Sequence, residues 1–267
     1  MKPGKKFYGI LAGVLLAAGV VSAGIGIRDF LKEEWAGRNY EDLREKVVNR
    51  MEKDSTPVPT VSPEKTPVSV SAEPIEIPID FEALTETNPD VYAWITIPGT
   101  EVDYPILQRV DDDSYYLTHT IEGKEAPEGA IYTESLNDQD FTDPNTVIYG
   151  HNMRNDSMFG SLHLFEDRDF FDEHRDLTIY LPDQILHYRI FAAYNYDNRH
   201  ILKSFDFQDE AQYQGYLDSI FQMRSMSSNL DTSISVDSSD RIVTLSTCNG
   251  NDDQRYLVQA VLISIDS

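Results

Sequence analysis

Cys248, the only cysteine of the 267-residue chain, lies seven positions before Arg255. The apolar, β-branched stretches 241–247 and 255–265 predict two strands, and Asn249-Gly250 between them is typical of a turn. A hairpin-like return of these strands places a thiol beside a guanidinium at one rim of a sheet. Because a nearby cation favours the thiolate and can stabilise an oxyanion, the pair indicates thiol chemistry.

A lone cysteine has no intramolecular disulfide partner, so two interpretations of Cys248 stand side by side. It is either a buried, inert thiol or a free, reactive one. Arg255 favours the reactive interpretation because of its charge. A cysteine nucleophile also requires a proton partner, which is normally a histidine.

Composition alone does not choose that partner. His151 stands out because it follows an apolar strand candidate, residues 146–149, and one glycine, which puts it at a strand end. His163 and His174 lie in helix candidates and His187 in a strand, where structural roles are expected. The chain offers six histidines in all: His119, His151, His163, His174, His187 and His200.

Other kinds of site lack their motifs. The sequence has no HExxH and no CxxC, so a zinc site is not expected. Residues 137–143 are acidic but lack the glycine of a calcium-binding loop. No glycine-rich phosphate loop follows a strand. We therefore expect no metal and no other cofactor.

The elements that position these residues belong to the second part of the chain. About eight short strands with helices in their connections predict a mostly-β fold, a closed eight-stranded barrel decorated with helices. The expected strands are 91–97, 102–106, 130–132, 146–149, 177–181, 185–196, 241–247 and 255–265. The expected helices or helical turns are 81–87, 111–117, 157–165, 169–174 and 208–224.

The N-terminus predicts a membrane anchor. Residues 7–27 carry no charge and follow Lys2, Lys5 and Lys6. At ~1.5 Å per residue such a helix spans a hydrocarbon core of ~30 Å, and its basic flank is expected to stay cytoplasmic. The alternative is a cleaved signal peptide, since residues 21–23 (VSA) resemble a cleavage site. The apolar run continues past that site, which favours the anchor.

Three further segments follow. Residues 28–53 predict a juxtamembrane helix, with i,i+4 charge pairs and apolar positions four or eight apart. Residues 54–79 form a Pro/Ser/Thr-rich linker, expected to stay extended as a stalk. The globular domain, residues 80–267, is expected to begin near Asp80. This topology predicts a single-pass protein of the cell membrane, with its N-terminus in the cytoplasm and its domain outside.

The charge excludes one class of partner. The formal net charge is −24, and nearly all the excess lies in residues 81–267, with 11 basic against 34 acidic residues. Such a field repels phosphate backbones, so nucleic acid is not an expected partner.

Several motifs resemble those of one protein family and occur in the same order along the chain. TLSTC at 244–248, followed by Arg255, resembles the active-site strand of sortases. IYGHNM at 148–153 and SMFGSL at 157–162 resemble the histidine region of class B sortases, which are membrane-anchored cysteine transpeptidases of Gram-positive bacteria. The N-terminal part of that class is matched by NPDVYAWITIPGT at 88–100, YPILQ at 104–108 and DDDSYYLTH at 111–119. The likeness covers residues 80–265.

The resemblance implies a sortase-type β-barrel and a transpeptidase mechanism. Cys248 would attack a threonine carbonyl in the C-terminal sorting signal of a secreted protein and form a thioester. His151 would transfer protons, and Arg255 would stabilise the oxyanion. An amine of peptidoglycan or of its lipid-linked precursor would resolve the thioester. No cofactor is implied.

The resemblance also places Leu117, Tyr149 and Ser246 in the peptide groove, although plain packing explains them equally well. Asp252 and Asp253, in the short connection after Cys248, are expected to be solvated turn residues, and orienting His151 or Arg255 is the alternative. Two other functions remain open: a hydrolytic cysteine peptidase of the same fold, and a non-enzymatic cell-wall-binding module.

Overall fold

The computed structural model describes residues 40–48, 69–71, 75–223, 228–251 and 253–267. The anchor predicted at residues 7–27 and its alternative cleavage site lie outside these residues. Within the described ranges, no helix is long and apolar enough to cross a bilayer.

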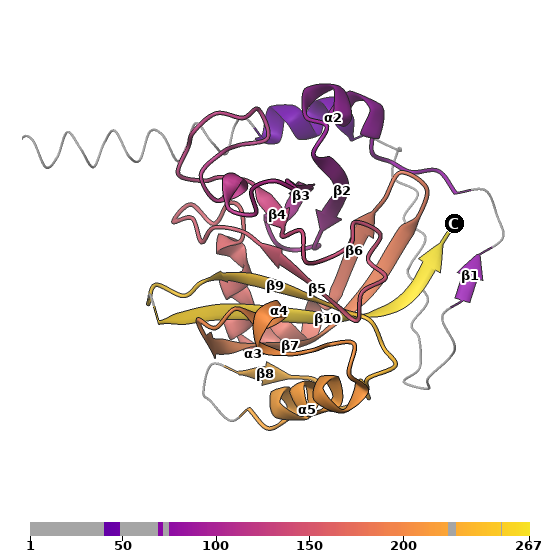
Figure 1. The fold of residues 1–267 in the computed structure, drawn as a ribbon, viewed down its shortest axis with the longest axis vertical. Coiled ribbons are helices and arrows are strands. Elements are labelled where there is room, and N and C mark those ends of the chain that lie inside the picture. Colours follow the sequence, from indigo (N-terminus) through magenta and orange to yellow (C-terminus); the bar gives the residue numbers. More distant parts are fainter. Residues whose placement is uncertain (1–39, 49–68, 72–74, 224–227, 252) are drawn as a thin grey trace, which may run out of the picture.

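Within the described residues, eight strands close into a barrel (Figure 1). β10 pairs with both β9 and β7, which closes the order β10-β9-β5-β4-β3-β2-β6-β7 into a ring. β1 and β8 pair at the outer edges of β10 and β7. The predicted closed eight-stranded barrel is therefore confirmed. The strands are β1 Ser69–Ser71, β2 Val91–Thr96, β3 Asp103–Gln108, β4 Ile131–Thr133, β5 Asn145–Tyr149, β6 Asp176–Tyr180, β7 Ile185–Asp197, β8 Asn229–Leu230, β9 Ile242–Cys248 and β10 Gln254–Asp266.

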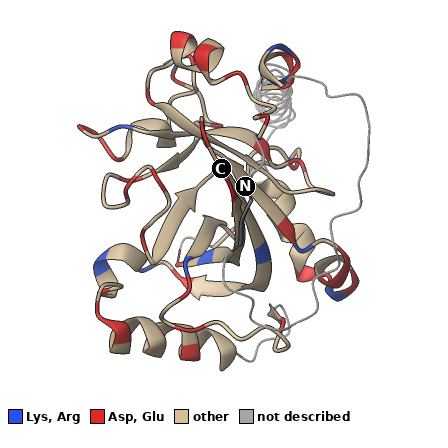
Figure 2. Ribbon diagram, turned by 90° about the vertical axis from the view of Figure 1, so that its right-hand side faces the viewer, with Lys and Arg blue, Asp and Glu red and all other residues tan. Residues whose placement is uncertain are grey.

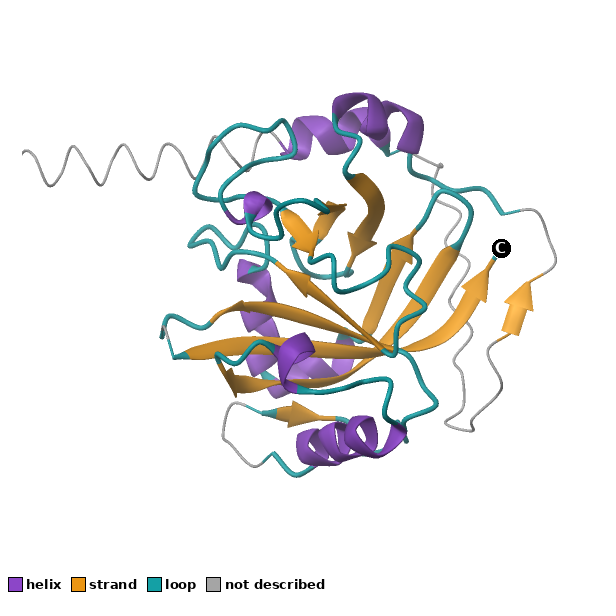
Figure 3. Cartoon of the chain, viewed as in Figure 1, coloured by secondary structure: helices purple, strands orange, loops and turns teal. Residues whose placement is uncertain are grey.

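The helices lie in the connections and at the periphery of the barrel (Figure 3). Asp80, Asp167 and Asp209 cap α2, α3 and α5, each accepting from backbone N–H groups of the first turn. The helices are α2 Phe81–Thr87, η1 Tyr115–Leu117, η2 Gly160–Glu166, α3 Arg168–Glu173, α4 Ile201–Ser204 and α5 Glu210–Phe221. Asp and Glu residues occur along these helices and the exterior loops (Figure 2), so much of the acidity belongs to the surface.

Two apolar clusters hold these elements together. Trp94, Ile95 and Ile106 are fully buried in the cluster inside the barrel. A second cluster lies between α5 and the outer face of β7, β9 and β10, where Tyr216 and Leu217 pack with Phe191. The packing fixes the long β7–β10 ladder, whose two register shifts bend the strands around the barrel.

Packing begins before Asp80, where the sequence analysis placed the start of the domain. Residues 40–47 are helical, and Tyr40 is buried with its hydroxyl donating to the Gly129 carbonyl at 3.0 Å. Arg44 forms an ion pair with Asp103 at 2.8 Å. The part of the predicted juxtamembrane helix that the structure describes therefore lies on the barrel.

Three other details differ from the expectation. β1 lies inside the predicted linker and pairs in parallel with β10 from Ser69↔Ser264 to Ser71↔Asp266. Residues 160–166 form a 3-10 helix rather than an α-helix, and α4 and β8 were not anticipated. These short elements are held by partners distant in the sequence, so local patterns carry little signal for them.

Candidate active site

Cys248 and Arg255 face each other across the β9–β10 ladder as directly opposed residues. Cys248 is the last residue of β9, and its side chain is exposed, whereas the six preceding residues are buried. Opposed residues in an antiparallel pair have Cβ atoms only about 4.5–5.5 Å apart. The buried part of the strand therefore presents the thiol beside the guanidinium at the rim, and the free-thiol interpretation is the one that fits.

The Arg255 guanidinium is available to a bound group. Its Nη1 donates to the Gln254 carbonyl at 2.9 Å, and among the described residues it makes no ion pair. Most arginines of the described domain do have a carboxylate partner, for example Arg199, whose Nε and Nη2 contact Asp197 at 2.7 and 2.5 Å. Arg255 therefore presents an unneutralised cation in the cleft that contains Cys248.

His151 reaches the same rim from β5, which runs parallel to β9 with Tyr149 beside Ser246. The Gly150 N–H donates to the Ser246 carbonyl at 3.2 Å, which continues the contact one residue further. A Cβ at Gly150 would lie 2.5 Å from Ile131 Cδ1 and 2.7 Å from the ring of the buried Phe159, so a larger residue here would have to displace that ring. His151, two residues after the end of β5, therefore lies at the same rim as Cys248.

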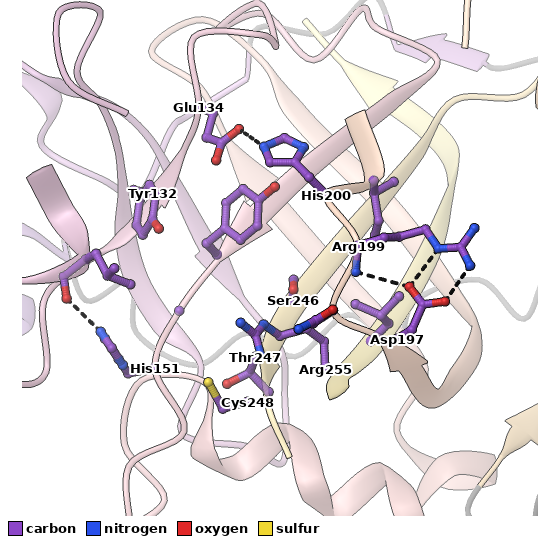
Figure 4. A pocket seen from close by; sticks show the side chains of 16 residues that line it. Tyr132, Glu134, His151, Asp197, Arg199, His200, Ser246, Thr247, Cys248 and Arg255 are labelled. Atoms are coloured by element: carbon purple, nitrogen blue, oxygen red, sulfur yellow. Dashed lines mark hydrogen bonds and ion pairs between the residues drawn. The ribbon is translucent and has the colours of Figure 1, made fainter. Parts of the chain in front are cut away.

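The orientation of the His151 ring is fixed by one hydrogen bond. Nε2 lies 2.7 Å from the Leu117 carbonyl, and because a carbonyl only accepts, Nε2 carries the proton. In the neutral ring Nδ1 is then the acceptor. Figure 4 marks this hydrogen bond of the His151 ring with a dashed line and shows the Cys248 sulfur between His151 and Arg255 in this view.

A cleft continues from this rim along the barrel wall. Tyr132, Tyr149, Ser246 and Leu257 follow one another across four neighbouring strands in register, and all four line the cleft. The two tyrosine rings stack with centroids 5.4 Å apart. Burial raises the pKa of both hydroxyls, so they stay neutral hydrogen-bonding groups.

The three residues expected in a peptide groove all line this cleft: Leu117, Tyr149 and Ser246. Leu117 has a second role, since its carbonyl holds His151. Sequence reasoning missed two other residues that line the cleft, His200 and Glu134, with His200 Nε2 lying 2.6 Å from Glu134 Oε2. No local pattern links two residues that are 66 positions apart.

Asp253 orients neither His151 nor Arg255 through any described contact. Its backbone N–H donates to the Asn251 side chain at 3.0 Å, and its carbonyl accepts from the Asn198 N–H at 3.2 Å. These bonds are those of a turn, in line with the expected turn role. Asp252 lies outside the described residues.

Two further side chains contact the backbone of Cys248. Asn152 Nδ2 lies 2.9 Å and His163 Nε2 3.0 Å from its carbonyl oxygen. The sequence placed His163 in a helix and favoured a structural role for it. For the contact of Asn152 with Cys248, the only local signal in the sequence was the position of Asn152 next to His151.

Comparisons with known proteins agree with this geometry. The sortase domain family matches residues 95–263. Sortase B of Listeria monocytogenes is 34% identical over 192 residues, which cover 71% of this chain and 76% of that protein. Sortase B of Staphylococcus aureus is 25% identical over 264 residues, 98% of each chain.

Solved structures give the same result. The crystal structure of sortase B from Bacillus anthracis in complex with AAEK1 has a TM-score of 0.67 at 28% identity, covering 89% of this chain and 99% of that chain. Sortase B of Clostridium perfringens has a TM-score of 0.62 at 30% identity, covering 69% and 100%. A Staphylococcus aureus sortase B–substrate complex has a TM-score of 0.61 at 28% identity, covering 68% and 84%.

Proposed function

The chain belongs to the sortase family, as a class B sortase, and we propose that Cys248, His151 and Arg255 carry out its cysteine transpeptidase reaction. The observation that supports this assignment is the cross-strand pair at the rim of β9 and β10. It combines an exposed thiol with an arginine that has no carboxylate partner among the described residues. The same cleft contains His151.

The first half of the reaction forms an acyl-enzyme. The Cys248 sulfur attacks the threonine carbonyl of a sorting signal, and its proton passes to His151, whose Nδ1 is the free acceptor of the neutral ring. The carbonyl π electrons move onto oxygen, where Arg255 stabilises the negative charge. As the tetrahedral intermediate collapses, the C–N bond breaks and His151 returns the proton to the leaving amine.

The second half transfers the acyl group. An amine attacks the thioester carbonyl while His151 accepts its proton, and Arg255 stabilises the second oxyanion. The C–S bond then breaks, the thiolate regains the proton, and a new amide remains. We propose an amine of peptidoglycan or of its lipid-linked precursor as the acceptor, and secreted proteins with a C-terminal sorting signal as the donors.

The cleft supports a peptide donor. Leu117, Tyr149 and Ser246 provide an apolar and hydrogen-bonding wall next to Cys248, which suits an extended peptide. One of the solved relatives is a Staphylococcus aureus sortase B–substrate complex. We propose that these three residues contact the sorting signal here.

The experiment incubates the full chain with a sorting peptide, with and without an amine acceptor. An acyl-enzyme on Cys248, seen by intact-mass spectrometry, and an amide product that depends on the acceptor are expected. Release of free acid at the same rate with and without the amine would favour the hydrolytic peptidase. Absence of any acyl-enzyme would favour the alternative that the protein is a non-enzymatic cell-wall-binding module.

We further propose that residues 7–27 anchor the protein as a single-pass membrane protein with its domain outside the cell. The support is the uncharged run after three lysines. N-terminal sequencing of protein from washed membranes tests this topology. An intact N-terminus is expected, and a start at Gly24 would refute the anchor while leaving the barrel and its site unaffected.

A further inference from the structure

The carbonyl group of Cys248 is bound by side chains that the reaction above does not use. Asn152 Nδ2 donates to this oxygen at 2.9 Å, and His163 Nε2 lies 3.0 Å from it. Asn152 directly follows His151 in the chain, and His163 belongs to η2. The backbone of Cys248 is therefore held by the segment that also carries the candidate general acid.

The imidazole of His163 is oriented on two sides. Its Nδ1 lies 2.8 Å from Glu166 Oε1, and because an ionised carboxylate only accepts, Nδ1 carries a proton. The ring stacks on Tyr256 with centroids 4.7 Å apart and planes at 23°. With Nδ1 fixed by Glu166 and the plane fixed by Tyr256, Nε2 is directed at the Cys248 carbonyl.

Each protonation state of His163 has a matching set of hydrogen bonds. In the neutral ring Nε2 accepts from Asn152 Nδ2 at 3.0 Å, and the other hydrogen of that amide reaches the Cys248 carbonyl. In the imidazolium, Nε2–H donates to the same carbonyl directly, as a charge-assisted bond. An ordinary imidazole passes between these states at pH 5–8.

We propose that His163, aligned by Glu166, is a positioning residue for the nucleophile. Its imidazolium form donates to the Cys248 carbonyl and, as a cation beside this residue, favours the thiolate over the thiol. The inference rests on the proposed role of Cys248 as the nucleophile. It makes the reactivity of the thiol depend on a second histidine in addition to His151.

The groups packed around His163 come from three elements. Among the described contacts, it faces Glu166 from η2, Cys248 from β9 and Tyr256 from β10. Burial raises the pKa of Tyr256, so this ring stays neutral. Asn152 is uncharged, and Glu166 is the one carboxylate among these described contacts, so it is the group that would neutralise the proposed imidazolium.

The test measures how fast iodoacetamide alkylates Cys248 in the full chain between pH 6 and pH 8. Because Cys248 is the only cysteine, the alkylated mass reports this thiol alone. In His163→Gln the side-chain amide keeps a donor but removes the charge. We expect wild-type and variant rates to match at pH 8, and the wild type to be roughly three- to tenfold faster at pH 6.

Two more variants separate positioning from folding. Glu166→Gln leaves the ring and its stack in place, and we expect it to show part of the same loss at pH 6. His187→Gln is the matched control, since His187 pairs with Asp266 at 3.0 Å at the other end of β7 and β10. The control is expected to follow the wild-type profile.

Two outcomes overturn the inference. Identical profiles for wild type and His163→Gln would show that the imidazole does not influence the thiol. A loss of equal size at every pH would show a purely structural effect. Alkylation needs no sorting peptide, so a failure of the proposed transpeptidase activity is recognised separately.

Discussion

β9 and β10 carry opposed polar residues at two levels along their length, an exposed pair at the rim and a buried pair further along the strands. At the rim, Cys248 opposes Arg255, and among the described contacts neither side chain has a side-chain partner. Four residues further along each strand, Thr244 opposes Gln259, and both are fully buried. The rim leaves its reactive groups open to a ligand, whereas the interior pairs its polar groups with one another.

The interior pairing is extensive. Gln259 Nε2 donates to the Tyr216 hydroxyl at 2.7 Å and to Thr244 Oγ1 at 2.8 Å, and its Oε1 accepts from Tyr194 at 3.0 Å. Thr244 in turn donates to Asn145 at 2.8 Å. A buried polar group without a partner costs stability, so this network contributes to the fold. The comparison predicts that substitutions at the rim change kcat, whereas substitutions at the buried level change the free energy of unfolding.

The largest effect is expected from Cys248→Ala. Without the sulfur no thioester forms, so transpeptidation should be abolished, while the exposed position contributes little to the core. Intact-mass spectrometry with a sorting peptide and thermal unfolding measure both quantities. Turnover at the wild-type rate by this variant would remove Cys248 from the mechanism.

The second-largest effect is expected from Arg255→Lys. The lysine keeps the charge but loses the planar fork that reaches an oxyanion. Losing one such donor typically lowers kcat by ~10²–10³, with little change in KM. Arg199→Lys is the matched control, because Arg199 lines the same cleft but is paired with Asp197. Retention of most of the kcat by Arg255→Lys would make Arg255 a groove or turn residue.

Gln259→Met tests the other level of the same strands. The substitution keeps the approximate length but removes the amide that accepts from the Tyr194 hydroxyl and donates to the Tyr216 hydroxyl and to Thr244. Because a buried polar group that loses its partner costs about 1–3 kcal/mol, the free energy of unfolding, from urea titration, should fall by about that amount, while the kcat of folded protein stays unchanged. The exposed Gln208→Met serves as control, with an expected change within ~0.5 kcal/mol. A large fall in kcat without loss of stability would contradict the division between the two levels.

The sequence predicted the barrel well because its strands show alternation or continuous apolar runs. The burial of six consecutive residues in β9, which ends just before the exposed Cys248, is the physical counterpart of the IVTLST pattern. β1 has no such pattern, since its three residues lie among prolines and are held by β10 alone. The buried Tyr40 belongs to a helix whose contact with the barrel depends on Gly129, 89 residues away.

The residues of the candidate site were likewise predictable from the sequence only in part. Cys248 and Arg255 were predictable as a pair because a short turn joins adjacent strands, which fixes their register. His151 was singled out by its place after a strand and a glycine, and the resemblance to class B sortases then selected it. The contact of His163 with Cys248 depends on the path of η2 across the barrel end. Periodicity within residues 157–165 predicts burial of that segment but not the residue it faces.

The smallest effect is expected between the two levels, at Tyr149, which lies two residues before His151 and beside Ser246. Tyr149 lines the cleft and its hydroxyl has no described partner, so Tyr149→Phe breaks no described intramolecular hydrogen bond. If the hydroxyl binds the sorting peptide, one neutral hydrogen bond is lost, and KM should rise about two- to tenfold at unchanged kcat. Tyr213→Phe is the contrasting variant, since Tyr213 donates to the Pro144 and Asp240 carbonyls, and it should lower stability without changing KM. Steady-state kinetics with a sorting peptide measure the difference. An unchanged KM in Tyr149→Phe would assign this tyrosine to the packing of the wall, where its ring stacks on Tyr132, and would confine recognition to other residues of the cleft.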